Sequence, residues 1–321
     1  MWKIYIAIAV AAFTFQVPAA GQDVYPSRPI KMIVAYPAGG GADILARTLS
    51  ETVGKLAGQQ MVVENRPGAS GMIGASACKN ALPDGYTLCL LISDALTVNP
   101  YIFKKVPYDA DKDLSPVASV AEVVAVFAVN GDTPVANLKD LSAYSKAQGG
   151  KVNWGTWGVG SAAHLLMAHM NNSSGAALYH VPYQGVPQIM SALMSKDIAG
   201  TMLVYGPMAQ HLQSGKLKPL AVLSNTRLPQ LPHVPTVNEQ GLNFASSLWY
   251  GVFAPSATPR PFIEKANGII NKALADPTVL QTLNLQGFIP LPGSSQSFAA
   301  RIAKDKTVWS PIAKGLNLAL D

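Results

Sequence analysis

The chain has few cysteines and few charged residues for its length, and both shortages narrow the class of protein. Two cysteines in 321 residues are too few for a disulfide-rich scaffold or for a zinc site built from four cysteines. Charged residues make up 13% of the chain and hydrophobic residues 49%, which excludes general disorder. A chain of this length can bury a large core and form two domains.

Basic residues slightly outnumber acidic ones but do not cluster. The net charge is +6, and the longest basic run is the pair Lys104-Lys105, with no aromatic residues interleaved among basic ones. This pattern lacks the basic patch that nucleic-acid binding requires, so we expect no nucleic-acid partner. A mild positive charge suits the long-range attraction of a small anionic ligand.

The first 21 residues have the pattern of an export signal. Lys3 supplies a positive charge, an apolar run covers Ile4–Phe15, and small residues follow at Pro18–Gly21. Spanning a bilayer takes about 20 apolar residues, so this run is too short for a transmembrane anchor. We predict a signal peptide at residues 1–21 and an exported mature chain beginning near Gln22. The alternative is a buried N-terminal strand or helix.

Short apolar runs alternate with amphipathic, helix-like segments along the chain, which predicts an α/β fold with helices on both faces of the sheets. The clearest helix begins after Pro259 and ends at Asp276-Pro277. The predicted strands are Ile30–Ala35, Met61–Glu64, Tyr86–Ile92, Val123–Val129, Val152–Trp154, Ala177–Val181, Ile198–Tyr205, Pro219–Leu223 and Leu248–Ala254.

Two glycine-rich turns each join the end of a predicted strand to the start of a helix. They are Tyr36–Gly41 and Gly155–Ser161. Ligands of open α/β sheets bind at this edge, and the free N–H groups of a helix's first turn attract anions. Two such anion sites, one in each half, are what a cleft between two lobes would need. The alternative is that each is only a tight turn.

Other chemistry is disfavoured by the motifs around these turns. Neither turn matches a phosphate-binding G-x-x-x-x-G-K-[ST] loop or a dinucleotide G-x-G-x-x-G, so we expect no cofactor. Asp43 would serve the helix dipole rather than act as a general base. Ser161 and His164 could form a hydrolase pair, but no G-x-S-x-G elbow surrounds Ser161. His164 and His169 are poorly spaced for two metal ligands on one helix, so we expect no metal site.

Several sequence blocks resemble a known family in order along nearly the whole mature chain. The chain is similar to the Bug-type periplasmic receptors, the substrate-binding proteins of tripartite tricarboxylate transporters. The blocks that carry the resemblance are Tyr25–Ile30, Tyr36–Asp43, Val63–Gly71, Pro83–Leu88, Asn99-Pro100, Pro107–Asp109, Gly158–Ser161 with His164, His180–Gly185, Gly215–Val222 and Leu231–Thr236.

This resemblance implies a two-lobed, Venus-flytrap fold, in which each lobe is a mainly parallel sheet flanked by helices. Lobe 1 would comprise residues 22–125 and 248–321, and lobe 2 residues 126–247, with crossings near Val123–Val129 and Ser247–Ala254. The implied function is capture of a small organic carboxylate and its delivery to the membrane permease subunits of a tripartite transporter. We expect a monomer that becomes more compact when it binds its ligand.

The predicted ligand-binding residues come from the two turns and from nearby strand ends, and no catalytic residue is expected. The alternatives are a receptor that signals through a sensor kinase and an exported Ser/His hydrolase. The predicted ligand contacts are Tyr36, Pro37, Ala38, Gly39, Gly40, Gly41, Asp43, Ser93, Trp157, Gly158, Gly160, Ser161, His164, Tyr183 and Tyr205, with Thr97 as a weaker candidate.

Tyr205 departs from the family pattern, because many relatives carry an acidic residue at this strand end. An acidic group could pair with a ligand ammonium, whereas a neutral tyrosine cannot. With Tyr36, Trp157 and Tyr205 in the cleft, we expect a mono- or dicarboxylate with an apolar or aromatic body rather than citrate or aspartate.

The two cysteines, Cys78 and Cys89, fall on a predicted helix and the strand that follows it. In an oxidising periplasm they would form one disulfide that closes a short loop. The alternative is two buried free thiols.

Overall fold

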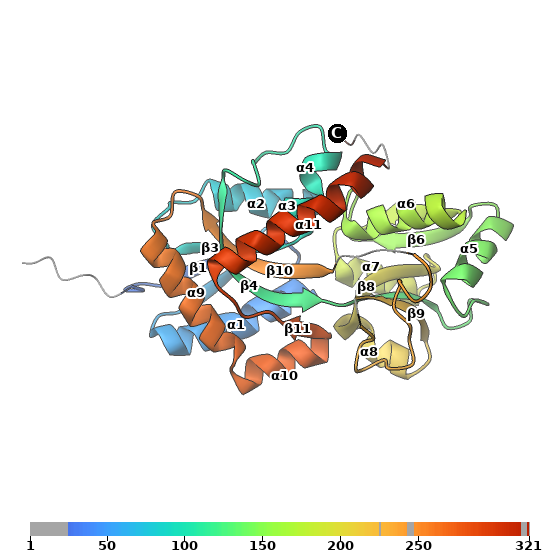
Figure 1. Ribbon diagram of the computed structural model, residues 1–321. Helices are drawn as coiled ribbons and strands as arrows, with labels where there is room; N and C mark the ends of the chain where they lie inside the picture. Colours follow the sequence, from blue (N-terminus) through green and yellow to red (C-terminus); the bar gives the residue numbers. More distant parts are fainter. Residues whose placement is uncertain (1–24, 225, 243–246, 316–319, 321) are drawn as a thin grey trace, which may run out of the picture.

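The computed structural model describes residues 25–224, 226–242, 247–315 and 320. It has two α/β lobes, each built on one sheet (Figure 1). The predicted signal peptide and Gln22 lie outside the described residues. No described helix is long and apolar enough to cross a membrane.

The first sheet has six strands in the order β11-β4-β10-β3-β1-β2, and the second has five in the order β7-β6-β8-β5-β9. Strands β10 and β11 run against the other strands of the first sheet, and β5 runs against those of the second. The first sheet comprises β1 (Ile30–Val34), β2 (Met61–Asn65), β3 (Thr87–Ile92), β4 (Leu114–Val123), β10 (Leu248–Pro255) and β11 (Phe288–Pro290). The second comprises β5 (Ala125–Asn130), β6 (Val152–Thr156), β7 (Leu178–Pro182), β8 (Gly200–Val204) and β9 (Leu217–Leu223).

Helices cover both faces of both sheets, as the alternating pattern predicted (Figure 1). On the first sheet, α1 (Gly41–Ala57) and α9 (Arg260–Leu274) pack on one face, and α2 (Met72–Lys79) and α11 (Ser295–Gly315) on the other. On the second, α5 (Leu138–Ala147) and α6 (Ala162–Ser174) lie opposite α7 (Val186–Met194) and α8 (Tyr205–Gln213). The remaining helices are η1 (Ala69–Gly71), α3 (Asp94–Thr97), α4 (Asn99–Ile102) and α10 (Pro277–Gln286).

One strand prediction was wrong in a way that matters for the lobes. The segment Val123–Val129 is not a single strand, because β4 ends at Val123 in the first sheet and β5 begins at Ala125 in the second. Val124 alone joins the two sheets at this crossing. The second predicted crossing, Ser247–Ala254, contains β10, which pairs with β3 and β4 inside the first sheet.

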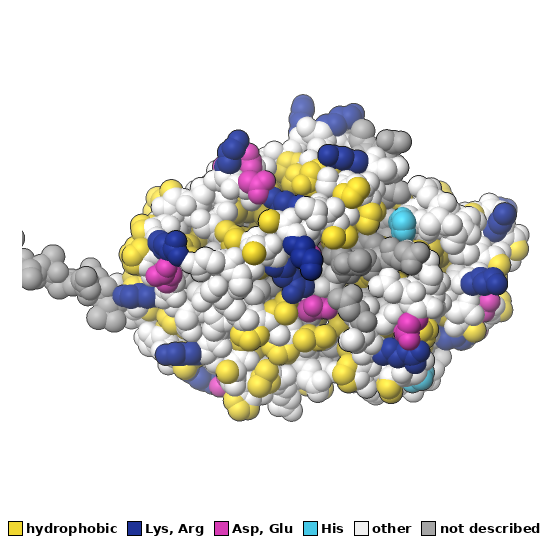
Figure 2. All heavy atoms as spheres, in the orientation of Figure 1, with side chains coloured by type: hydrophobic (Ala, Val, Ile, Leu, Met, Phe, Trp, Pro, Cys, Tyr) yellow, Lys and Arg dark blue, Asp and Glu magenta, His cyan; other side chains and the backbone are white. Residues whose placement is uncertain are grey.

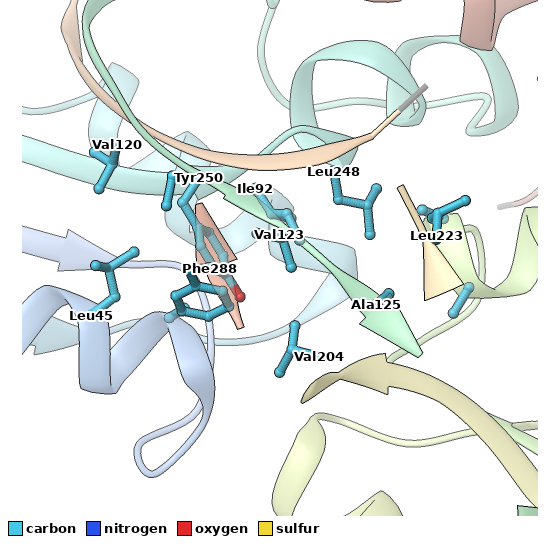
Figure 3. Close-up of a cluster of buried hydrophobic side chains, with 14 of the residues drawn as sticks. Leu45, Ile92, Val120, Val123, Ala125, Val204, Leu223, Leu248, Tyr250 and Phe288 are labelled. Atoms are coloured by element: carbon cyan, nitrogen blue, oxygen red, sulfur yellow. The ribbon is translucent and has the colours of Figure 1, made fainter. Parts of the chain in front are cut away.

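The two lobes are in contact, so the chain adopts a closed arrangement. One cluster of buried side chains includes residues of both sheets, and Figure 3 shows Ile92, Tyr250 and Phe288 of the first sheet near Val204 of the second. The Ser70 hydroxyl also donates across the boundary to the Val159 carbonyl at 2.6 Å. On the face shown in Figure 2, Lys and Arg side chains are scattered rather than gathered.

The structure joins Cys78 of α2 to Cys89 of β3 by a disulfide, with the two Cα atoms 5.9 Å apart. Both cysteines are fully buried. This link ties α2 to the sheet face on which it packs. The structure therefore contradicts the alternative of two buried free thiols.

Candidate ligand site between the lobes

A cavity of about 40 Å³ lies where the carboxyl edges of the two sheets face each other. Most of its lining is apolar side chain and glycine backbone. The first lobe contributes Tyr36, Pro37, Gly40, Gly41, Ala42, Ile92, Leu248 and Tyr250, and the second contributes Trp157, Gly185, Val186, Leu203 and Val204.

Three helix N-termini reach this cavity without a side-chain cap. The residues before α1, α7 and α8 are Gly40, Gly185 and Val204, and none of the three makes a capping side-chain hydrogen bond. The first N–H groups of a helix have no partner inside the helix, and the helix dipole adds positive potential there. The cavity therefore combines an apolar wall with backbone donors suited to one anion.

The second predicted anion site, the N-terminus of α6, is already occupied by the chain's own carboxylate. Asp94 of the first lobe accepts a hydrogen bond from the Ala162 N–H at 2.8 Å and another from the Trp157 indole N–H at 3.3 Å. Ser161 caps the same helix by accepting from the His164 N–H. The N-terminus of α6 is thus capped, unlike the three that reach the cavity.

Sequence reasoning missed Asp94, which is only 1% exposed. Burial raises the pKa of this carboxyl group to about 6, and the hydrogen bonds from Ala162 and Trp157 oppose that rise. The sequence position of Asp94 could have indicated it, because Asp94 follows the carboxyl end of β3, on the edge where ligands of such sheets bind. Tyr250 was also missed, and its ring lines the cavity from β10.

Seven of the predicted contacts line one of two neighbouring cavities. Tyr36, Pro37, Gly40, Gly41 and Trp157 line the 40 Å³ cavity. Gly158 and Tyr183 instead line a neighbouring cavity of about 290 Å³, which shares Tyr36 and Trp157 with the first. The side chains of Tyr36 and Trp157 therefore stand between the two spaces.

Asp43 shapes the first turn rather than facing the cavity. One carboxylate oxygen accepts from the Gly39 N–H and from Arg47, each at 3.0 Å, and the other accepts from Asn65 at 3.0 Å. Burial raises the pKa of Asp43, but these hydrogen bonds outweigh it and the pKa is lowered. Gly39 and the exposed Ala38 do not line the described cavity, so they belong to the turn and not to its inner wall.

Ser161 and His164 are not arranged as a nucleophile and a base. The Ser161 hydroxyl donates to the Gly158 carbonyl at 2.8 Å, and His164 Nδ1 accepts from the Gly160 N–H at 3.1 Å. The His164 ring stacks on His180 at 3.8 Å between centroids. Ser161, His164 and Gly160 therefore hold the second turn in shape. Among the described residues, no group of three metal-ligating side chains could hold a metal ion.

Tyr205, Ser93 and Thr97 do not line either cavity. Tyr205 is 4% exposed, belongs to the buried cluster of the second lobe and lies against Gly287 of the first lobe. The Thr97 hydroxyl donates to the Ser93 carbonyl at 2.9 Å, and both residues are fully buried. The aromatic wall predicted from Tyr205 is instead supplied by Tyr250.

The stacked histidines predict a pH dependence of stability. Burial lowers the pKa of both His164 and His180 to about 4, so the unfolded chain binds protons first as pH falls below about 6.5. The two histidines should therefore contribute a rise in stability with pH between about 4.5 and 6.5, which the raised pKa of Asp94 partly opposes. The variant His180→Phe keeps a stacked ring with one titrating group fewer and should show a shallower rise in its urea midpoint. Parallel curves for the two proteins would contradict the assignment.

Two α/β lobes closed on a cavity define a periplasmic solute-binding protein, and comparisons with known proteins agree. Residues 45–318 match the family described as "Tripartite tricarboxylate transporter family receptor", and the chain belongs to this family. It is 36% identical to protein BugT of Bordetella pertussis, over 97% of this chain and 95% of that protein. The members of this family are binding receptors and not enzymes, so the alternative of an exported Ser/His hydrolase does not hold.

Solved structures share the fold across nearly the whole chain. The periplasmic binding protein BugD is 31% identical, with a TM-score of 0.86, over 92% of this chain and all of that one. An R. palustris protein solved with adipate is 28% identical, with a TM-score of 0.87, over 92% of this chain and all of that one. MatC from Rhodopseudomonas palustris, solved with malate, is 26% identical, with a TM-score of 0.84, over 90% of this chain and all of that one.

Proposed function

We propose that this receptor captures a small organic carboxylate with an apolar body and delivers it to the permease subunits of a tripartite tricarboxylate-type transporter. The observation that carries the proposal is the meeting of three uncapped helix N-termini at one apolar cavity between the lobes. Backbone donors bind a carboxylate, and the rings of Tyr36, Trp157 and Tyr250 contact the rest of the ligand.

We also propose that the mature protein is periplasmic and monomeric and that its signal peptide has been removed. The lobes would divide at residues 125–126 and 247–248, close to the crossing at Val124 that separates β4 from β5. The acids in the related structures, adipate and malate, support a carboxylate ligand. No Lys or Arg lines the described cavity, which favours an acid of low charge over citrate.

A thermal-shift screen of the refolded mature protein tests this function. The screen should cover mono-, di- and tricarboxylates, aromatic acids, amino acids and sugars as non-acidic controls. A ligand at 100 times its dissociation constant stabilises the folded state by about 2.7 kcal/mol, which gives a clear shift. We expect shifts with carboxylates that have apolar bodies. The proposal would be contradicted if only sugars shifted the melting temperature, or if no acid shifted it.

A further inference from the structure

We propose that Asp94 determines which acids the receptor accepts, because its carboxylate takes the place that a second ligand carboxylate would occupy. The receptor should then select monocarboxylates with apolar bodies over dicarboxylates. This inference rests on the function proposed above and narrows its substrate class.

Asp94 reaches across the boundary between the lobes. It begins α3 at the end of β3 in the first lobe, yet its partners are Ala162 and Trp157 of the second lobe. The two donors converge on the same oxygen, Oδ2. A carboxylate in this position occupies the N-terminal donor of α6, the helix that follows the second glycine-rich turn.

Trp157 links the Asp94 carboxylate to the ligand cavity. The Trp157 indole lines the cavity and donates its N–H to Asp94, so a single side chain connects the two places. Ile92, two residues before Asp94, lines the same cavity. A ligand carboxylate directed toward α6 would meet donors that are already used and a buried negative charge.

The N-terminus of α6 differs from those of α1, α7 and α8. Their N-termini have no side-chain cap, whereas α6 is capped twice, by Ser161 and by Asp94. The three uncapped N-termini therefore attract an anion, whereas the buried carboxylate behind Trp157 repels one, since like charges disfavour each other strongly in a buried environment. An acid with one carboxylate and an apolar body satisfies both conditions.

Calorimetry with matched acid pairs tests the inference. The mature protein is unfolded, freed of bound ligand, refolded and titrated at pH 7.5 with hexanoate and adipate, and with benzoate and terephthalate. In each pair the wild-type protein should bind the monocarboxylate at least tenfold more tightly. Asp94→Ser removes the charge and opens space, and it should shift the ratio at least tenfold toward the dicarboxylate. Asp94→Asn removes only the charge and should give a smaller shift in the same direction.

Asp305→Asn is the matched control. Asp305 is also a buried carboxylate that accepts an indole N–H, from Trp249 at 2.7 Å, but it packs on the α11 face of the first sheet. This variant should leave the ratio unchanged.

The inference is overturned if the wild-type protein binds the dicarboxylates as tightly as the matched monocarboxylates. It is equally overturned if the Asp94 variants keep the wild-type ratio of the two affinities. It is also overturned if phenylalanine binds more tightly than 3-phenylpropanoate and loses that advantage in Asp94→Asn, because Asp94 would then hold an ammonium group. The wild-type ratio decides even if Asp94→Ser does not fold. Binding of none of these acids by the wild-type protein would refute the proposed function together with the inference.

Discussion

Gly40→Asp should lower the affinity for the carboxylate ligand about 100-fold or more while the protein stays folded. The new side chain would place a carboxylate at the N-terminus of α1, as Asp94 does at α6. It would occupy the donors meant for the ligand and repel its charge. Asp is a favourable N-cap residue, so α1 should be at least as stable as before. Calorimetry measures the affinity, and thermal unfolding measures the stability.

Gly40→Ala is the control for this substitution. The backbone at Gly40 is extended, with φ −84°, and an added Cβ would make only an ordinary contact of 3.5 Å with the Pro37 carbonyl oxygen. Affinity should change little in this variant. Wild-type affinity in Gly40→Asp would remove the first turn from the ligand site.

Gly185→Val should keep the lobes apart and weaken ligand binding at least tenfold. A Cβ at Gly185 would lie 2.8 Å from Cγ and 3.0 Å from Cδ of Pro37 in the opposite lobe. The φ of 174° is extended backbone that any residue adopts, so the clash arises at the lobe boundary. A ligand that binds the closed form loses affinity when that form is depopulated.

Solution X-ray scattering with saturating ligand measures this opening directly. The wild-type protein should become more compact with ligand, and Gly185→Val should keep a larger radius of gyration. Gly268→Ala is the control, because a Cβ there meets nothing within 4 Å and the residue lies on α9, away from the lobe boundary. Equal compaction of Gly185→Val and the wild-type protein would show that the Pro37–Gly185 contact does not limit closure.

Local sequence signals predicted the regular elements well. The apolar run that forms β3 is buried throughout from Leu88 to Ile92, and α9 occupies the segment after Pro259, where the pattern indicated it. Strand β4 was missed except at its end because Ser115 and Pro116 interrupt its apolar pattern near the start. The break between β4 and β5 at Val124 could not be predicted from the sequence, since an apolar run continues through it from one sheet into the other.

The site was predictable where it depends on chain order and not where it depends on packing between lobes. A strand, a glycine-rich turn and a helix follow one another at Gly40, so the first turn was found from local sequence. Asp94 reaches a helix that begins 68 residues later in the chain, which no local pattern indicates. Tyr205 lies against Gly287, far along the chain, which no local pattern indicates either.

A crystal structure of the protein with the acid that binds most tightly in the screen would show where the ligand carboxylate lies. We expect closed lobes and one ligand carboxylate at the N-termini of α1, α7 and α8, with the apolar body against Trp157 and Tyr250. Asp94 should remain on the Ala162 N–H. A ligand bound outside the cleft, or with its carboxylate held away from all three helix ends, would contradict the account.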